Sequence, residues 1–309
     1  MKARLLFLSI TAFSLAVFVS SCQKDSSAND DYATEASTHS DDQSTVSAEI
    51  DAVANDADAM LESTAGFTAR PGDIQNFICD ATVEVDTFSN PRTITITYNG
   101  SNCLGNRTRT GVVILSMPQG VRWVNPGAAI SVTFQNLKIT RVRDNRSVTF
   151  NGTKTYTNVS GGLLVNLPNL NSITHTITSS NMSVTFDNGT QRSWQIAKQR
   201  VFTYNNGVVI TSSGTHTEGN LTNIAEWGTN RFGRAFTTST TEPLIVRQDC
   251  SFRLTNGKVT HTTPAFTSSA TFGLDATGAP TTCPGAGTYY MKIVWTGTGG
   301  ATRTIILPY

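Results

Sequence analysis

Three histidines share one local sequence, and imidazole nitrogens are common ligands for transition metals. His175, His216 and His261 each stand between two threonines. If neighbouring strands place them side by side on one face, the three imidazoles form a metal site. The alternative is that Thr-His-Thr belongs to the solvated face of threonine-containing strands, because no His-x-His pair accompanies the motif. We favour this alternative and expect no cofactor.

Basic residues gather in the segment LKITRVRDNRS, around an expected hairpin tip. A basic surface attracts anionic partners, including lipopolysaccharide phosphates, acidic glycans or the acidic part of the same chain. The alternative is that these charges protect a solvated sheet from edge-to-edge aggregation. The candidate ligand-binding residues of this segment are Lys138, Arg141, Arg143 and Arg146.

Two of the four tryptophans adjoin turn residues and are candidates for stacking on sugars. Trp123 lies in VRWVNPG and Trp227 in AEWGTN. The alternative places them in the core, where most tryptophans of β-proteins lie.

The sequence offers little support for catalysis. No G-x-S-x-G segment is present, and no spare thiol is available for a Cys/His pair. Several carboxylates adjoin turn residues or arginines, which favours capping or ion pairing over glycoside hydrolysis. We therefore expect a non-catalytic protein, with a polysaccharide-acting hydrolase as the alternative. The carboxylates available to such a hydrolase are Glu84, Asp86, Asp144, Asp187, Glu218, Glu226, Glu242 and Asp249.

Five cysteines are present, and the first differs from the others in its surroundings. Cys22 follows the positive residues Lys2 and Arg4, the apolar run LLFLSITAFSLAVFV and two serines. This layout is typical of an export signal and resembles the lipobox of bacterial lipoproteins, in which the cysteine is acylated and becomes the mature N-terminus. The alternative is a plain signal peptide cleaved near Ser21. Lipidation predicts that Cys22 anchors the protein in a membrane, with the outer membrane as the expected location. The export signal also argues against a nucleic acid partner.

The other four cysteines form an even number in an exported chain, which predicts two disulfides with three possible connectivities. Proximity in the sequence favours Cys79–Cys103 and Cys250–Cys283. A zinc site is the alternative, but the spacings lack the close ligand pairs that zinc sites use.

Charge is distributed unevenly along the chain. Residues 22–62 contain one basic and eleven acidic residues, whereas residues 63–309 contain twenty basic and eleven acidic ones. After the signal peptide of residues 1–21, we expect a disordered acidic tether over residues 22–43, because almost nothing in it can be buried. Residues 44–63 carry an apolar stripe at helical spacing and predict an amphipathic helix that docks on the basic domain or stands as a stalk.

From about Ile78 onward, polar residues alternate with β-branched or aromatic ones, as in TITITYN and SVTFQNLKI. Asn-Gly steps separate these runs at hairpin spacing, and no convincing helix follows residue 63. The sequence therefore predicts an all-β domain over residues 64–309. Its fold is a large antiparallel meander, arranged as a sandwich, a barrel-like shell or a wrapped sheet.

The segments CDATVEVDTFSNPRTITITY, RTRTGVVILS, ISVTFQNLKI, FNGTKTYTN and NRFGRAFTTSTTEPLIVRQDC resemble β-rich lipoproteins of the Bacteroidota. The likeness covers Ser44 to about Lys258. It implies a cysteine-bracketed β-body and an envelope location, and it implies no activity. We therefore expect an outer-membrane lipoprotein that binds an anionic or glycan ligand without catalysis. A second alternative to this role, besides the hydrolase, is a carrier with an apolar cavity.

Overall fold

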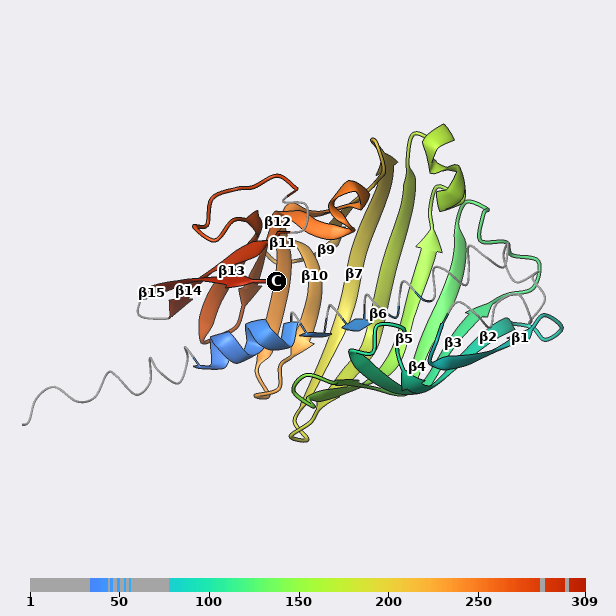
Figure 1. The fold of residues 1–309 in the computed structure, drawn as a ribbon, viewed down its shortest axis with the longest axis horizontal. Coiled ribbons are helices and arrows are strands. Elements are labelled where there is room, and N and C mark those ends of the chain that lie inside the picture. Colours follow the sequence, from blue (N-terminus) through green and yellow to red (C-terminus); the bar gives the residue numbers. More distant parts are fainter. Residues whose placement is uncertain are drawn as a thin grey trace, which may run out of the picture.

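The computed structural model describes residues 34–43, 45–46, 49–50, 53, 56, 78–283, 287–297 and 300–309. The signal peptide, Cys22 and the end of the expected helix lie outside these residues. Most of the described chain forms one antiparallel sheet of fifteen strands, which confirms the expected all-β meander. Figure 1 shows that the sheet is strongly curved, in a barrel-like way, and that the helical residues lie on its concave side.

The strands follow the alternating segments of the sequence, and two short 3-10 helices interrupt them. The strands are β1 (Ala81–Asp86), β2 (Arg92–Ser101), β3 (Arg107–Met117), β4 (Ala128–Arg141), β5 (Ser147–Asn158), β6 (Ile173–Phe186), β7 (Gln191–Tyr204), β8 (Val208–Gly214), β9 (His216–Glu218), β10 (Leu221–Thr229), β11 (Ala235–Arg247), β12 (Arg253–Thr262), β13 (Phe266–Leu274), β14 (Tyr290–Gly297) and β15 (Thr302–Pro308). The 3-10 helices are η1 (Leu164–Asn169) and η2 (Gln248–Cys250).

Neighbours in the sheet are almost always neighbours in the sequence. The order runs from β1 to β7, continues with β10 and ends at β15. Strand β8 pairs with one half of β7 and with β11, while β10 pairs with the other half of β7 and with β11. The two therefore share one position in the sheet, and β9 forms a small hairpin with β10.

The sheet curves at β-bulges, and a glycine on the adjacent strand faces each of the bulges described here. The register between β3 and β4 shifts after Thr110, where Gly111 has a φ of 111°. A Cβ on Gly111 would lie only 2.3 Å from the carbonyl oxygen of Asn136. The same arrangement recurs at Gly152 on β5, where an added Cβ would lie 2.4 Å from the carbonyl oxygen of Asn181. Such bulge and glycine pairs bend a sheet around its concave face.

The concave face holds the main apolar core. Alternate residues of β2 to β7 are buried there, among them Ile94, Leu115 and Phe150, each with no solvent exposure. Val46, Ile50 and Val53 of the helical residues belong to the same apolar cluster. The sheet therefore curves around the helical segment, whose apolar residues cover the apolar concave face.

The helical residues begin earlier in the chain than the sequence predicts. Residues 34–43 are helical, as are 45, 46, 49, 50, 53 and 56; we call this set the acidic helix. The expectation of a disordered tether is therefore wrong for residues 34–43, because Glu35, His39 and Asp42 are buried against the sheet. None of the described helical segments has the length and apolar character that a membrane-spanning helix needs.

Candidate functional site

Acidic side chains of the acidic helix pair with arginines of the concave face. These ion pairs extend from β3 to the loop before β11. Asp42 lies 2.5 Å from Arg231, and burial raises the pKa of Asp42 to about 6 although Arg231 acts in the opposite direction. The acidic helix therefore docks on the basic domain, as expected for its opposite charge. The other pairs are Glu35–Arg234, Asp41–Arg146, Glu49–Arg107 and Asp56–Arg109.

Arg109 is the most fully coordinated of these arginines. Its guanidinium donates to both carboxylate oxygens of Asp80, at 2.7 and 2.6 Å, and to Asp56 at 2.7 Å. The same guanidinium lies 4.4 Å from the centre of the Tyr98 ring, whose hydroxyl donates to Asp56. Because Arg109 is only 8% exposed, these contacts replace its hydration and make it a structural residue.

A second buried charge cluster centres on Glu226 of β10. Arg192 and Lys198 of β7 donate to its carboxylate at 2.9 and 2.5 Å, and Gln43 of the acidic helix donates at 3.0 Å. Burial alone raises the pKa of Glu226, but Lys198 and Arg192 outweigh it and hold the pKa well below its usual range. A carboxyl with a lowered pKa is a poor general acid, so this cluster serves to pair charges.

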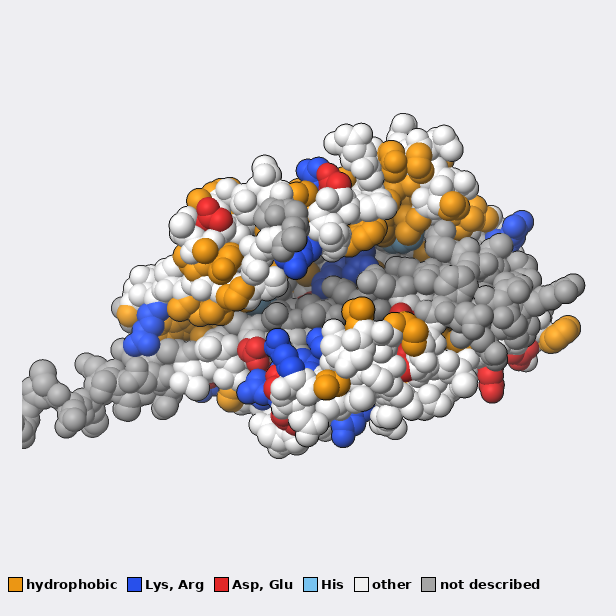
Figure 2. All heavy atoms as spheres, in the orientation of Figure 1, with side chains coloured by type: hydrophobic (Ala, Val, Ile, Leu, Met, Phe, Trp, Pro, Cys, Tyr) orange, Lys and Arg blue, Asp and Glu red, His pale blue; other side chains and the backbone are white. Residues whose placement is uncertain are grey.

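A groove of about 1300 Å³ runs between the acidic helix, the β4–β5 and β6–β7 hairpins and strands β14 and β15. Its lining side chains include six arginines and four carboxylates, a net charge of +2. In Figure 2, basic and acidic side chains gather below the centre of the view, beside the hollow in the middle of the molecule. The arginines are Arg107, Arg141, Arg143, Arg146, Arg231 and Arg303, and we call the first five the arginine wall.

The arginine wall combines anchored and accessible cations. Arg107 and Arg141 are cross-strand partners, and each has its own carboxylate, Glu49 for Arg107 and Asp144 for Arg141. Arg143 and Arg146 instead expose 76% and 61% of their side chains. Ion pairs between such exposed groups are weak, so Arg143 and Arg146 remain available to an anion in the groove.

Of the predicted basic residues, the structure brings three together and separates the fourth. Arg141, Arg143 and Arg146 line the groove. Lys138 is exposed, but it alternates with the buried residues Leu137 and Ile139 and therefore lies on the convex face. The prediction of one basic cluster is wrong for Lys138.

The opposite wall of the groove is mostly apolar and was not predicted. Arg303 lies on its face too, as the cross-strand partner of Trp295. Ile293 pairs with Ile305 and Met291 with Leu307, and cross-strand partners lie on the same face of a sheet. Together with Trp295, they form what we call the apolar wall. The alternation in YYMKIVW predicts a strand here, but nothing in the sequence shows that its inner face lines a groove.

The three Thr-His-Thr histidines occupy separate environments. His175 lies between Trp123 and Phe202, with ring centres 5.0 and 4.9 Å apart. His261 shares a hydrogen bond with Thr238 and contacts His39, while His216 stacks on Trp227. The hypothesis that these three histidines hold one metal is wrong, because the topology places each of them in a different aromatic cluster.

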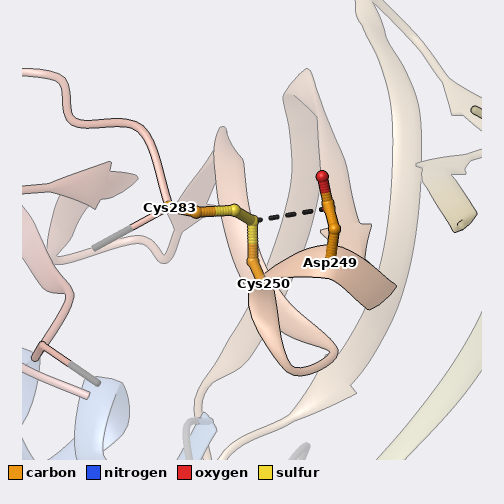
Figure 3. Close-up of side chains that lie close together, drawn as sticks. All are labelled: Asp249, Cys250 and Cys283. Carbon is orange, nitrogen blue, oxygen red and sulfur yellow. Dashed lines mark hydrogen bonds between the residues drawn. A yellow bond between two sulfur atoms is a disulfide. The ribbon is translucent and has the colours of Figure 1, made fainter. Parts of the chain in front are cut away.

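Within the described residues, the one group of three potential metal ligands is Asp249 with Cys250 and Cys283. Figure 3 shows that the two sulfur atoms are joined in a disulfide and that the Asp249 carboxylate lies beside them. A disulfide sulfur is a poor metal ligand, since metals bind the thiolate. The other predicted pair, Cys79–Cys103, is also a disulfide. Both pairings favoured by the sequence are present, and the zinc alternative is wrong.

The two candidate tryptophans are not open platforms for sugars. Trp123 is 2% exposed and packs in the core. Trp227 is half-buried and stacks on His216 with an interplanar angle of 14°. Several candidate carboxylates are paired, Asp144 with Arg141 and Asp249 with Arg247. These arrangements favour structural roles for all four residues.

Beneath Val46 and Ile50, little space is left between the acidic helix and the sheet. A cavity of about 20 Å³ lies between Val46, Ile50 and strands β5 to β7, which is room for about one water molecule. Comparison with protein-family models, with curated proteins and with solved structures finds no match to this chain. The groove is therefore the feature from which a function can be argued.

Proposed function

We propose that this protein is an outer-membrane lipoprotein, anchored through an acylated Cys22, whose β-domain is a non-catalytic binding module for an anionic ligand. The observation that carries the binding role is the arginine wall of the 1300 Å³ groove. Arginine presents a planar set of donors that suits phosphate and carboxylate groups, so a groove with several arginines favours anions.

The packing of the acidic helix against the concave face supports a binding surface over an enclosed carrier. A carrier needs a hollow apolar interior, whereas Val46, Ile50 and Val53 pack into the concave face of this sheet. Hydrolysis is also less favoured, since Glu226 is held ionised between two cations and Asp144 pairs with an arginine. These observations favour the groove as the ligand-binding surface.

Binding is tested with the mature chain carrying Cys22→Ser, which has no lipid, against lipopolysaccharide and polyanionic and neutral glycans. We expect binding of the anionic members to weaken steeply between 50 and 300 mM salt, because exposed charges are screened over about 10 Å at 0.1 M. The double variant Arg143→Ala/Arg146→Ala is expected to bind about tenfold more weakly.

Lys138→Ala is the matched control, because it removes an exposed cation from the opposite face of β4. It should leave the affinity unchanged. Equal losses in the control and in the arginine variant, or affinity that does not depend on salt, would contradict the proposal.

The anchor is tested in cells by labelling with a palmitate analogue. We expect label on the wild-type protein in the membrane fraction, and neither label nor membrane association for Cys22→Ser. Labelling that persists in Cys22→Ser would place the lipid on another residue.

A further inference from the structure

The apolar wall carries hydrophobic side chains that are exposed to solvent. Ile305 and Leu307 of β15 are 44% and 39% exposed, and both lie on the face that lines the groove. Beside them, Met291 and Ile293 of β14 continue the same apolar strip. Contiguous apolar surface that is bordered by polar residues is a common feature of sites where proteins bind other molecules.

The arginine wall and the apolar wall belong to one groove. A ligand that contacts both walls must carry negative charge in one part and an apolar chain in another. Free glycans lack the apolar part, and a purely apolar molecule would leave Arg143 and Arg146 without a partner from the ligand. The groove volume of about 1300 Å³ also exceeds the 300–1000 Å³ that is common for small-molecule pockets.

We propose that the groove binds a phosphorylated acyl lipid, with the phosphate at Arg143 and Arg146 and the acyl chain along β14 and β15. This inference rests on the proposed function and specifies its ligand class. Phosphate fits because Arg143 and Arg146 lie on one hairpin, between β4 and β5, line the groove and keep most of their side chains exposed. The acyl chain fits because burying Ile305 and Leu307 removes apolar surface from water.

The test compares three probes with the mature Cys22→Ser chain by calorimetry, all below their critical micelle concentrations. They are lysophosphatidic acid, glycerol 3-phosphate, which lacks the chain, and lysophosphatidylcholine, whose added choline makes the head group zwitterionic. We expect lysophosphatidic acid to bind at least about tenfold more tightly than either of the others. Within a series of chain lengths, affinity should rise about two- to fourfold for each methylene.

The outcomes separate the two proposals. If glycerol 3-phosphate binds as tightly as lysophosphatidic acid, the acyl-chain inference fails while the anionic binding role stands. If the two lysolipids bind equally tightly at every salt concentration, the arginines contribute nothing, and the proposed function fails. Binding of polyanionic glycans without binding of lysophosphatidic acid would overturn this inference alone. A protein that sediments as a dimer and binds no lysolipid would overturn it too, because a second copy would then cover the groove.

A second measurement places the chain without altering β15. Trp295 lines the groove, so a bromine-labelled acyl chain bound along the apolar wall quenches its fluorescence. We expect the quenching to disappear in Trp295→Phe and to persist in Trp227→Phe, whose tryptophan stacks on His216 away from the groove lining. Quenching that is unchanged in Trp295→Phe would overturn the assignment of the chain to this wall.

Discussion

Burial keeps several histidines of the core uncharged. His261 has 3% exposure and shares a 2.7 Å hydrogen bond with Thr238. Burial, with the nearby positive charge of Arg192, lowers its pKa to about 4. Burial and Arg200 lower the pKa of His175 to about 4 in the same way. Both residues are therefore core side chains, and burial favours the neutral form of their imidazole rings.

Stability is therefore expected to fall as the pH drops from about 6.5 to 4. In that range the unfolded chain binds protons at these two histidines and the folded chain does not, so their contribution is complete above 6.5 and is lost toward 4. Each contributes up to about 3 kcal/mol. Asp42 acts in the opposite direction, because its pKa is raised to about 6 and the folded state takes up its proton first. Two histidines outweigh one carboxyl, so the net effect of acid is destabilising.

His175→Phe tests this account, because phenylalanine fills the same site between Trp123 and Phe202 without titrating. Urea unfolding from pH 7 to 4.5 should show a pH slope that is smaller by as much as about 1.4 kcal/mol per pH unit. A slope that stays the same in His175→Phe would contradict the assignment.

At the scale of elements, the acidic helix and the sheet are joined by ion pairs and by a shared apolar core. The helix brings its carboxylates to arginines of β3 and of the loop before β11, and its apolar residues join the core of β2 to β7. In proteins, most of the stability of a helix comes from the packing of its amphipathic face. The helix is therefore held by the sheet rather than by its own propensity.

The strength of these helix contacts depends on burial. Side-chain exposure is 27% for Arg107 and 6% for Glu49, but 61% for Arg146 and 58% for Asp41. Double-mutant cycles with Glu49→Gln and Arg107→Gln should give a coupling energy of about 1–2 kcal/mol. The exposed pair, tested with Asp41→Asn and Arg146→Gln, should give less than about 0.5 kcal/mol. Equal couplings would contradict a helix that is seated with Glu49 in the interior.

Most strands could be predicted from alternation, and their faces could not. Counting every second residue from Phe134 puts Lys138 on the inner face and Arg141 on the outer face. The bulge between Phe134 and Leu137 reverses this, so that Ile139 and Arg141 lie inside. One extra residue moves all later side chains to the other face, and single-sequence periodicity does not locate bulges.

The early start of the helix could not be predicted for a different reason. Residues 34–43 have few apolar side chains, and local composition favours disorder for such a segment. Their partners are far away in sequence, since Asp42 pairs with Arg231 and Asn230 donates to Glu35 across 195 positions. Pairs that are so far apart in the sequence cannot be predicted from local sequence patterns.

At the scale of the whole molecule, the described sheet ends at β1 and β15, and a disulfide lies at the β1 end. Strand β1 pairs with β2 alone. The Cys79–Cys103 disulfide links the segment just before β1 to the loop after β2, across a separation of 24 residues. The Cys250–Cys283 disulfide links η2 to the segment before β14, across 33 residues. The first cross-link thus holds the end strand β1, whereas the second joins the loops before β12 and β14, two strands that have partners on both sides.

Removing one cross-link should lower the stability of the whole domain. In the chain-entropy model, a disulfide that spans 24 residues contributes about 3 kcal/mol. Cys79→Ser/Cys103→Ser is therefore expected to lower the free energy of unfolding by about that amount. The measurement is urea unfolding beside the wild-type protein without reductant, in which the midpoint should fall. Cys22→Ser changes a cysteine outside these pairs and should have no such effect. An unchanged midpoint in the double variant would show that β1 is held by its pairing with β2 alone.

The position of the acidic helix also determines the order in which the chain can fold. Synthesis delivers residues 34–56 early and Arg231 much later, because the chain is made from its N-terminus. Until then Asp42 has no counter-charge, and Gln43 waits for Glu226, 183 positions further on. Contacts of such long range make folding slow. The interior can therefore close only after β10 has emerged, and the early strands must hold the helix, or leave room for it, until that moment.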